Sequence, residues 1–306
     1  MNRVLVIGAA GMIGRKLTAR LLKEGVGELI QQDVVPFEGT VSDLSAPGEA
    51  EKLIAKRPDL IFHLAAVVSG EAEADFDKGY RVNLDGTRYL FEAIRKEGYK
   101  PKVVFTSSIA VFGAPFPDAI GDEFLNAPLT SYGTQKAIGE LLLSDYSRRG
   151  LFDGIGIRLP TICVRPGKPN KAASGFFSGI LREPLAGQEA VLPVPDTVRH
   201  WFASPRAAIE FLIHASRINT ELLGTRRNLS MPGLSCTVAE QIAALGRVAG
   251  DKATRLISRE PDQTIMRIVE GWPRNFDARR ALALGFRPDP CFEDIIRFHL
   301  EDELGR

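Results

Sequence analysis

The sequence has few of the residues that cross-link small proteins or hold metals. Its 306 residues include only three cysteines, at positions 163, 236 and 291, and no two of them form a CxxC pair. We therefore expect no disulfide framework and no metal site. Separate, reduced thiols are typical of a reducing compartment, which predicts a cytoplasmic protein.

Excess charge and long apolar runs are also absent. The 39 basic and 38 acidic residues leave a formal net charge of +1, so we expect no binding to nucleic acid. No run reaches the roughly 18 apolar residues that a membrane helix needs, and the N-terminal run, residues 4–7, is too short for a secretion signal. With 44% hydrophobic residues, the chain is instead predicted to fold around one large core or two smaller ones, with no membrane partner.

Short apolar runs and helical patterns alternate along the first half of the chain. Because the runs are continuously apolar, they predict a parallel sheet with helices on both faces, a doubly wound α/β fold. Residues 160–200 are rich in proline and glycine and show little periodicity. We predict a cofactor domain at 1–165, with returns near 200–230, and a smaller, loop-rich cap over most of 166–306. The predicted strands are 4–7, 28–32, 40–42, 60–64, 103–106 and 154–159, and the predicted helices include 82–96, 134–148, 205–216, 238–248 and 292–303.

A glycine triplet lies between the first predicted strand and the first predicted helix. Gly8 permits a tight turn, Gly11 removes a Cβ that would collide with phosphates, and Gly14 lets the helix pack closely. Asp33, at the end of the second strand, can accept hydrogen bonds from both hydroxyls of an adenosine ribose and repels a 2′-phosphate. No Arg or Lys occupies positions 31–35. This pattern favours NAD over NADP, with an ordinary loop aspartate as the alternative.

The ends of the third and fourth predicted strands supply further cofactor candidates. A side chain after the third strand can meet the adenine edge, and small residues after the fourth let the backbone pass along a ribose. His63, within the fourth strand, is interpreted as a structural histidine rather than a catalyst. The predicted cofactor set also contains Met12 and Ile13 in the glycine turn, and Asp43, Leu44, Leu64, Ala65 and Ala66.

A tyrosine and a lysine share one face of a predicted helix. Tyr132 and Lys136 are four residues apart in the sequence, which is about one helical turn. A phenol has an ordinary pKa near 10, so it acts as a base at neutral pH only beside a cation such as the Lys136 ammonium. Ser108 ends the fifth predicted strand, where α/β sheets bind their ligands, and its hydroxyl can hold a substrate oxygen against the phenol. The alternative is a serine that only caps the strand end.

Together these segments resemble the extended short-chain dehydrogenases, the family of NAD-dependent epimerases and dehydratases. The match spans essentially the whole chain. The segments that carry it are the GxxGxxG turn, HLAA at 63–66, VNLDGT at 82–87, TSSIAVFG at 106–113, YGTQK at 132–136, and the GIR and RPG segments near 156 and 165.

The resemblance implies a Rossmann-type sheet with a C-terminal substrate cap, NAD as the cofactor, and a homodimer. It implies that Ser108, Tyr132 and Lys136 are catalytic, that Tyr132 and Lys136 also contact the cofactor, and that Asn83 lies near it. Phe112 and Arg165 stand where the family often has Tyr and Gly. Neither departure touches the residues of proton transfer.

The second half resembles a subfamily that oxidises four-carbon sugar acids, such as D-erythronate, at the C2 hydroxyl. The similar segments are 162–188, 193–208 and 271–286. The stretch from 158 to 182 contains basic residues and no acidic ones, and a small carboxylate substrate needs positive charge, ideally a guanidinium. A solvated basic surface is the alternative. The predicted substrate contacts are Ser69, Ser108, Tyr132, Asn170, Ser174, Arg182 and Arg199.

Two other functions share the same cofactor pattern. A nucleotide-sugar 4-epimerase or dehydratase would use the same cofactor site but needs room for a nucleotide, whereas the second half resembles enzymes of small acids. A non-enzymatic NAD-sensing regulator commonly keeps the glycine turn and loses the tyrosine and the lysine. This chain keeps both Tyr132 and Lys136.

Overall fold

The computed structural model describes residues 3–167 and 173–306, and the chain folds as two compact units. Unit 1 takes its residues from 1–111, 128–158 and 209–230. Unit 2 takes its residues from 112–127, 159–208 and 231–306. The chain therefore enters each unit several times. The predicted boundary at residue 165 lies within a stretch that belongs to unit 2.

Unit 1 is built on a seven-stranded sheet in the order β10-β6-β5-β4-β1-β2-β3. The strand order reverses between β1 and β4, which is the switch point where such sheets bind their ligands. This confirms the predicted α/β fold with a parallel sheet. The strands are β1 (Arg3–Ile7), β2 (Glu28–Asp33), β3 (Thr40–Val41), β4 (Leu60–His63), β5 (Lys102–Ser108), β6 (Asp153–Leu159) and β10 (Asn228–Ser230).

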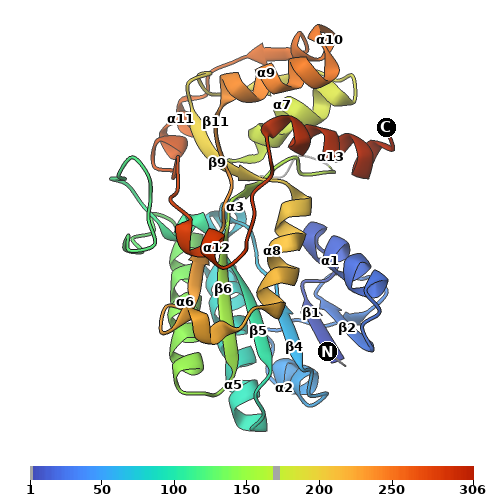
Figure 1. Ribbon diagram of the computed structural model, residues 1–306, viewed down its shortest axis with the longest axis vertical. Helices are drawn as coiled ribbons and strands as arrows, with labels where there is room; N and C mark the ends of the chain where they lie inside the picture. The colour runs from blue at the N-terminus through green and yellow to red at the C-terminus, as the bar shows by residue number, and fades with distance from the viewer. Residues whose placement is uncertain (1–2, 168–172) are drawn as a thin grey trace. The chain divides into compact units, whose positions relative to one another are not determined.

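Helices cover both faces of this sheet (Figure 1). Helices α2, α5 and α6 pack side by side on one face. Helix α1 lies on the other, where ion pairs of Arg20 with Glu210 and of Arg217 with Glu24 join it to α8. The helical segments are α1 (Met12–Lys23), α2 (Glu49–Ile54), α3 (Ser69–Ala74), α4 (Phe76–Gly79), the π-helix η1 (Tyr80–Asp85), α5 (Gly86–Glu97), η2 (Ile109–Val111), α6 (Ser131–Arg148), η3 (Thr220–Leu223) and α8 (Pro205–Arg217), which belongs to unit 1 from Ile209 onward.

The register of the sheet brings the predicted cofactor residues to one edge. Ile7 lies opposite Gln32 on one side and His63 on the other, and His63 lies opposite Phe105. The residues that follow these four are therefore neighbours at the carboxyl ends of the strands. They are Gly8, Asp33, Leu64 and Thr106.

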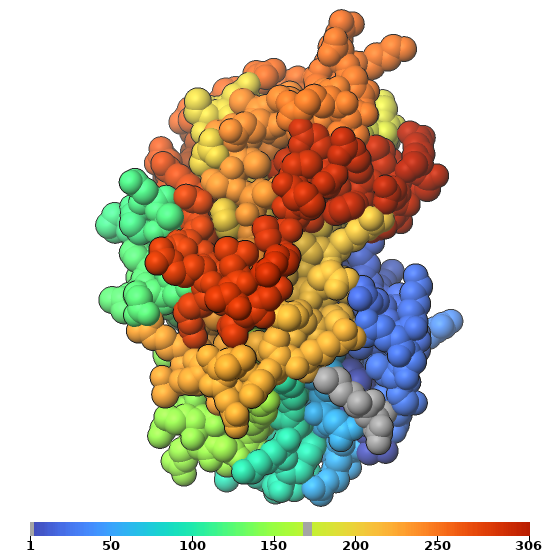
Figure 2. Space-filling view, in the orientation of Figure 1, coloured from blue at the N-terminus to red at the C-terminus, as the bar shows by residue number. Residues whose placement is uncertain are grey.

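Unit 2 contains two small sheets, one in the order β11-β9-β7 and one of β12 and β8. Helices α9 and α13 pack against each other and form part of its surface (Figure 2). The elements are β7 (Thr161–Ile162), α7 (Gly175–Leu185), β8 (Ala190–Leu192), β9 (Arg199–Ala203), β11 (Leu234–Thr237), α9 (Val238–Ala249), α10 (Asp251–Thr254), β12 (Ile257–Arg259), α11 (Gln263–Glu270), α12 (Arg279–Ala283) and α13 (Phe292–Leu304).

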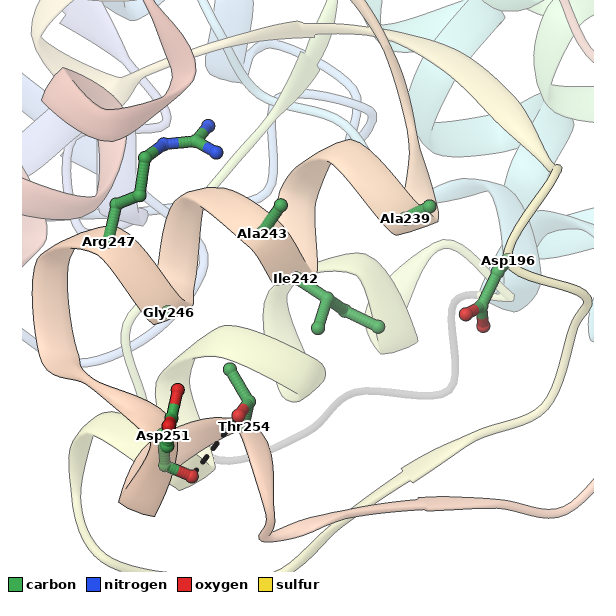
Figure 3. Close-up of a pocket in the computed structure, with 8 residues that line it drawn as sticks. All are labelled: Asp196, Ala239, Ile242, Ala243, Gly246, Arg247, Asp251 and Thr254. Atoms are coloured by element: carbon green, nitrogen blue, oxygen red, sulfur yellow. Dashed lines mark hydrogen bonds between the residues drawn. The ribbon is translucent and has the colours of Figure 1, made fainter.

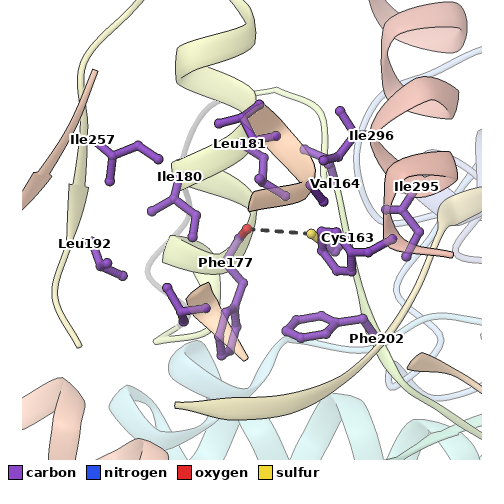
Figure 4. Close-up of a cluster of buried hydrophobic side chains, with 14 of the residues drawn as sticks. Cys163, Val164, Phe177, Ile180, Leu181, Leu192, Phe202, Ile257, Ile295 and Ile296 are labelled. Carbon is purple, nitrogen blue, oxygen red and sulfur yellow. Dashed lines mark hydrogen bonds between the residues drawn. The ribbon is translucent and has the colours of Figure 1, made fainter. Parts of the chain in front are cut away.

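Each unit has its own hydrophobic core, as expected for a chain of this composition. In unit 1 the core lies between the sheet and α2 and α5, and it includes Phe91 and Phe105. In unit 2 the side chains of Phe177, Phe202 and Ile296 meet between α7, β9 and α13 (Figure 4). Cys163 lies in this second core as a buried free thiol.

Two expectations about regular structure were wrong. Helix α7 and strands β7, β8 and β9 occupy 160–200, where the sequence shows little periodicity. Helix α7 has a buried face of Phe177, Ile180 and Leu181 and ends near Pro184. The predicted helix at 82–96 begins instead as a π-helix, and the α-helix starts only at Gly86. π-Helical turns are rare and occur mostly at functional sites.

Candidate active site

The glycine turn between β1 and α1 is closely packed. A Cβ at Gly14 would lie 2.1 Å from the carbonyl oxygen of Gly8, and a Cβ at Gly8 would lie 2.7 Å from the amide nitrogen of Ala65. Gly8 also has a φ of +87°, which favours glycine. No side chain caps α1 at Gly11, and its first turn, which holds Met12 and Ile13, carries no acidic residue. The amide groups of this helix end suit a pyrophosphate.

Asp33 lies directly beside this turn. Its Oδ2 accepts a hydrogen bond of 2.9 Å from the Ala10 amide, and its Oδ1 accepts one of 2.7 Å from the Val34 amide. The carboxylate is therefore fixed at the carboxyl end of β2, next to the proposed phosphate site. This is the position that a ribose-binding acid requires.

Asp43 and Arg81 form an ion pair that the sequence pattern did not reveal. The Asp43 carboxylate accepts hydrogen bonds from the amide and hydroxyl of Ser45, and Arg81 Nη1 lies 2.6 Å from its Oδ2. Burial alone would raise the pKa of Asp43, but the bonds from Ser45 and Arg81 hold it below its ordinary value. Leu44, the next residue, is buried.

Asn83 holds the loop that follows β4. Its side-chain amide exchanges two hydrogen bonds with the backbone of Val67, at 2.8 and 3.1 Å, and donates a third of 2.8 Å to Gln135. The loop contains Leu64, Ala65 and Ala66, and Ser69 starts α3 just after it. The π-helix η1 thus links this loop to α6. No pattern in the sequence indicated a role for Gln135.

Tyr132 and Lys136 lie one turn apart on α6, and Ser108 ends β5. Lys136 is buried, its Nζ donates a 2.8 Å hydrogen bond to the carbonyl oxygen of Thr106, and it lies 5.8 Å from the centroid of the Tyr132 ring. The hydroxyl of Ser108 accepts a hydrogen bond of 3.1 Å from the amide of Ala110. The structure therefore places the three predicted catalytic residues on adjoining elements of unit 1.

Gly133 allows α6 to approach the segment after β5. A Cβ at this position would lie 2.2 Å from the carbonyl oxygen of Ala110. Thr130 caps the helix, because its hydroxyl accepts a 3.0 Å hydrogen bond from the Gly133 amide. These two contacts set where α6 begins and hence where Tyr132 lies. The glycine within YGTQK was the signal in the sequence for this close approach.

Burial lowers the pKa of Lys136 to about 8, and the attraction of Glu140 opposes that shift. His63 is also buried, with its Nε2 2.8 Å from the hydroxyl of Thr87. Burial, together with the charge of Lys136, lowers the pKa of His63 to about 3. His63 is therefore neutral at ordinary pH, in keeping with its predicted structural role.

The predicted substrate residues of unit 2 are engaged within their own unit. Arg182 donates a 2.8 Å hydrogen bond to the Arg165 carbonyl and pairs with Glu183. Arg199 pairs with Glu240 at 3.2 Å and donates to the carbonyl of Ser235. Ser174 directly precedes α7, and Asn170 lies outside the described residues. Arg158, counted with the basic stretch, is buried against Glu140 in unit 1.

Two hollows lie among the described residues of unit 2. One, of about 220 Å³, is lined by Arg199 and Arg274 over the apolar side chains of Val198, Met266 and Val269. Arg274 has no side-chain partner among the described residues, and sequence reasoning missed it. The other, of about 540 Å³, lies along α9 beside Asp196 and contains no predicted site residue (Figure 3).

A family model described as the NAD dependent epimerase/dehydratase family matches residues 4–203. The chain belongs to this family. As a member of it, the protein is an NAD-dependent oxidoreductase that acts on a CH–OH group. The glycine turn and Asp33 fit NAD, because no side chain caps the amide groups at the start of α1 and the Asp33 carboxylate is held beside them.

Individual members of the family are similar over nearly the full length. A protein of Cupriavidus necator named D-erythronate dehydrogenase is 48% identical over 98% of both chains. A protein of Haemophilus influenzae with the same name is 41% identical over 99% of this chain and all of its own. A crystal structure described as the nucleoside-diphosphate-sugar epimerase from Agrobacterium tumefaciens is 67% identical, with a TM-score of 0.94 over 99% of this chain and 95% of that one.

Neither a metal site nor a membrane-spanning helix is present among the described residues. They contain no group of three or more histidine, cysteine or acidic residues placed to hold a metal ion. Within the same residues, no helix is both long and apolar enough to cross a membrane.

Proposed function

We propose that the protein oxidises the C2 hydroxyl of D-erythronate, a four-carbon sugar acid, with NAD. The observation that carries this proposal is the similarity to two proteins named D-erythronate dehydrogenase over 98% or more of the chain. The arrangement of Ser108, Tyr132 and Lys136 in unit 1 supports it. An alcohol oxidation needs a group that orients the hydroxyl, a base that takes its proton and a cation that stabilises the base.

Tyr132 is the proposed base and Ser108 the proposed substrate-orienting residue. The Tyr132 phenolate takes the proton of the C2 hydroxyl, while the Ser108 hydroxyl orients that oxygen. The Lys136 ammonium stabilises the phenolate and is itself held by the Thr106 carbonyl. The chemistry that NAD would supply when bound is a nicotinamide acceptor for the hydride of C2.

The proposed cofactor site is at the carboxyl end of the sheet of unit 1. The glycine turn would hold the pyrophosphate, Asp33 the adenosine ribose, and Asp43 with Leu44 the adenine side. The loop of Leu64, Ala65 and Ala66, which Asn83 holds in place, would lie along the cofactor. Tyr132 and Lys136 complete this set.

The proposed contacts of the substrate carboxylate are cationic side chains of unit 2. Arg182 and Arg199 remain proposed contacts, with Ser69, Ser174 and Asn170 for the hydroxyls. The hollow that holds Arg199 adds Arg274, whose guanidinium has no partner among the described residues. A guanidinium without a protein partner can form two hydrogen bonds to a carboxylate.

A nucleotide-sugar epimerase is the second candidate, because the 67% identical crystal structure carries that description. The two functions differ in whether NADH accumulates. An epimerase returns the hydride to its substrate, so it releases no net NADH, whereas a dehydrogenase releases one NADH for each acid oxidised. A regulator that only binds NAD would turn over neither compound.

The decisive experiment is a screen of the purified protein for NADH release. We expect signal with D-erythronate and NAD, and weak or no signal when NADP replaces NAD, because Asp33 would repel the 2′-phosphate. Other four-carbon aldonates and a panel of sugar nucleotides form the matched arms. If only another acid gives a signal, D-erythronate is not the substrate. If a sugar nucleotide is converted without release of NADH, the protein is not a dehydrogenase.

Two further properties are part of this proposal. We propose a homodimer, to be tested by light scattering of the purified protein. The cytoplasmic location also stays a prediction, and fractionation of the source cells would test it.

A further inference from the structure

A buried ion pair lies beside the proposed catalytic residues. The side chains of Glu140 and Arg158 are 2% and 10% exposed, and two hydrogen bonds join them. Arg158 Nε lies 2.8 Å from Oε1 of Glu140, and Arg158 Nη2 lies 2.7 Å from Oε2. The Ser107 hydroxyl donates a third hydrogen bond of 2.6 Å to Oε1. Such two-pronged pairs are the strongest and most directional of protein ion pairs.

The pair connects the same elements that carry the catalytic residues. Glu140 lies one turn after Lys136 on α6, so the two side chains share a face of the helix. Ser107 directly precedes Ser108 on β5. Arg158 is on β6, the neighbouring strand. The pair is therefore within unit 1 and next to both the lysine and the serine.

Few charged groups surround Lys136. On its own helix it faces the Tyr132 phenol and the Glu140 carboxylate, and on β5 it contacts the Thr106 carbonyl and the Phe105 ring. His63 on β4 is neutral, because burial lowers its pKa to about 3. Arg158 on β6 binds both oxygens of Glu140. The Lys136 ammonium is thus near one carboxylate whose charge a guanidinium balances.

Stabilisation of the fold alone does not explain why the Glu140–Arg158 ion pair is buried. Burying two charges costs so much free energy that an apolar pair of the same size often stabilises a protein more. A buried pair that persists beside a reacting centre can instead serve to set the electrostatic potential there. The potential matters here because the proposed reaction needs an ionised phenol and a protonated lysine at the same pH.

We propose that Glu140 and Arg158 are positioning residues that set the pH range in which Tyr132 is ionised while Lys136 stays protonated. The inference rests on the proposed roles of Tyr132 and Lys136, but not on the identity of the sugar acid. Glu140 holds the proton on Lys136, and Arg158 prevents the same carboxylate from opposing the ionisation of Tyr132.

The test uses the opposite charge changes of two single variants. Glu140→Gln leaves Arg158 unbalanced, so both limbs of the pH profile of kcat should move to lower pH. Arg158→Met leaves Glu140 unbalanced, so both limbs should move to higher pH. A unit charge one helical turn away in a medium of intermediate dielectric produces shifts of about one to two pH units. In the double variant Glu140→Gln/Arg158→Met, both limbs should return close to those of the unchanged protein.

Two further variants separate this role from loss of folding. Asp145→Asn removes an exposed carboxylate from the same helix and should leave both limbs in place. Glu140→Asp keeps the charge, so it should keep the limbs even where kcat falls. If Glu140→Gln does not fold, the double variant and Glu140→Asp still test the charge balance, since each preserves the net charge of the pair. If the limbs of the pH profile move by a pH unit in the double variant or in Glu140→Asp, the proposal is overturned.

A spectroscopic titration makes the outcome independent of the substrate. Tyrosinate absorbance is measured against pH, with Tyr132→Phe in each background as the blank. The ionisation assigned to Tyr132 should move down in Glu140→Gln and up in Arg158→Met. The proposal would be overturned if the limbs of the pH profile and the ionisation of Tyr132 do not move. It would also be overturned if they move in the same direction in Glu140→Gln and in Arg158→Met. Failure of the substrate screen with a shifting tyrosinate signal would overturn only the proposed function.

Discussion

The charged side chains beside the proposed catalytic residues of unit 1 and those around Arg199 in unit 2 are held in different ways. In unit 1, Lys136, Glu140 and Arg158 are buried and joined by short hydrogen bonds to each other or to β5. In unit 2, Arg199 and its partner Glu240 have side chains that are 38% and 54% exposed. Buried charges tolerate little change, because removing one partner leaves the other unpaired. Exposed pairs contribute at most about 1 kcal/mol and are easily replaced.

This difference indicates a division of labour. Unit 1 carries the proposed chemistry, which belongs to the whole family and depends on fixed geometry. Unit 2 carries the proposed contacts to the substrate carboxylate, such as Arg199, which can change at small cost to stability. Substitutions in unit 1 should therefore lower kcat, and substitutions in unit 2 should raise KM for the acid.

The largest effect should come from Tyr132→Phe in unit 1. The variant lacks the proposed base, so kcat should fall by about 10²- to 10⁴-fold, the usual contribution of a general base. The affinity for NAD should change little, since the glycine turn and Asp33 are untouched. Steady-state kinetics measure kcat, and a fluorescence titration with NAD measures the affinity for the cofactor. A variant with nearly full activity would remove Tyr132 from the mechanism.

Gly133→Ala should have the next largest effect. The new Cβ would lie 2.2 Å from the Ala110 carbonyl oxygen, so α6 must move away from β5 and carry Tyr132 with it. Displacement of a reacting group by about 1 Å can lower a rate by about 100-fold. The free energy of unfolding should fall by about 1–3 kcal/mol, as for other overpacked sites.

Gly86→Ala is the matched control for this variant. Gly86 also lies in a helix of unit 1, but a Cβ there would have its nearest neighbour at 3.7 Å. We expect kcat close to that of the unchanged protein, and urea unfolding should show little loss of stability. Equal losses of kcat in both variants would contradict the role given to the close approach of α6.

In unit 2, Arg199→Met and Arg274→Met should raise KM for the sugar acid. A charge-assisted hydrogen bond contributes about 1.5–3 kcal/mol, which corresponds to a rise of about 10- to 100-fold. The affinity for NAD should not change. Arg247→Met, in the hollow along α9 (Figure 3), is the control and should leave KM unaltered. A rise in KM for Arg247→Met alone would move the substrate contact to that hollow.

The last comparison is between one buried histidine in each unit. Burial lowers the pKa of His63 in unit 1 to about 3 and that of His200 in unit 2 to about 4, from 6.5. Below pH 6.5 the unfolded chain therefore takes up protons that the folded chain does not. The free energy of unfolding should fall with decreasing pH by about 1.4 kcal/mol per unit for each histidine, between about pH 6 and pH 4.

His63→Asn should remove about half of that slope. Urea unfolding at several pH values measures it, with His200→Asn as the corresponding variant in unit 2. A slope that stays the same in both variants would show that other groups cause the acid sensitivity.

Much of unit 1 could be predicted from the sequence because its signals are local. The continuous run Val4–Ile7, the glycine spacing and the four-residue interval from Tyr132 to Lys136 each describe one element and its neighbour. The parallel sheet follows from repeating that pattern. The π-helix at Tyr80–Asp85 could not be predicted, because its apolar spacing resembles that of an ordinary helix over one turn.

The buried pair of Glu140 and Arg158 is not a local signal. The two residues lie on different elements, and only the register of the sheet brings β6 behind α6. In unit 2, Arg199 and Arg274 line the same hollow. They are far apart in the sequence, and no pattern between them indicates that the fold brings them together. The acid-free stretch was misleading for Arg158, because its partner Glu140 precedes that stretch. Helix α7 was missed because its buried face is short and glycines and a proline interrupt it.

The chain passes from one unit to the other five times, since each unit is assembled from three separate stretches. The edge strand β10 of the unit 1 sheet consists of Asn228–Ser230 and pairs with β6. During synthesis, the sheet that carries the proposed chemistry therefore stays incomplete until about three quarters of the polypeptide has left the ribosome. For the same reason, exchanging the second unit between relatives would require replacing three segments, with five new junctions, rather than making one fusion.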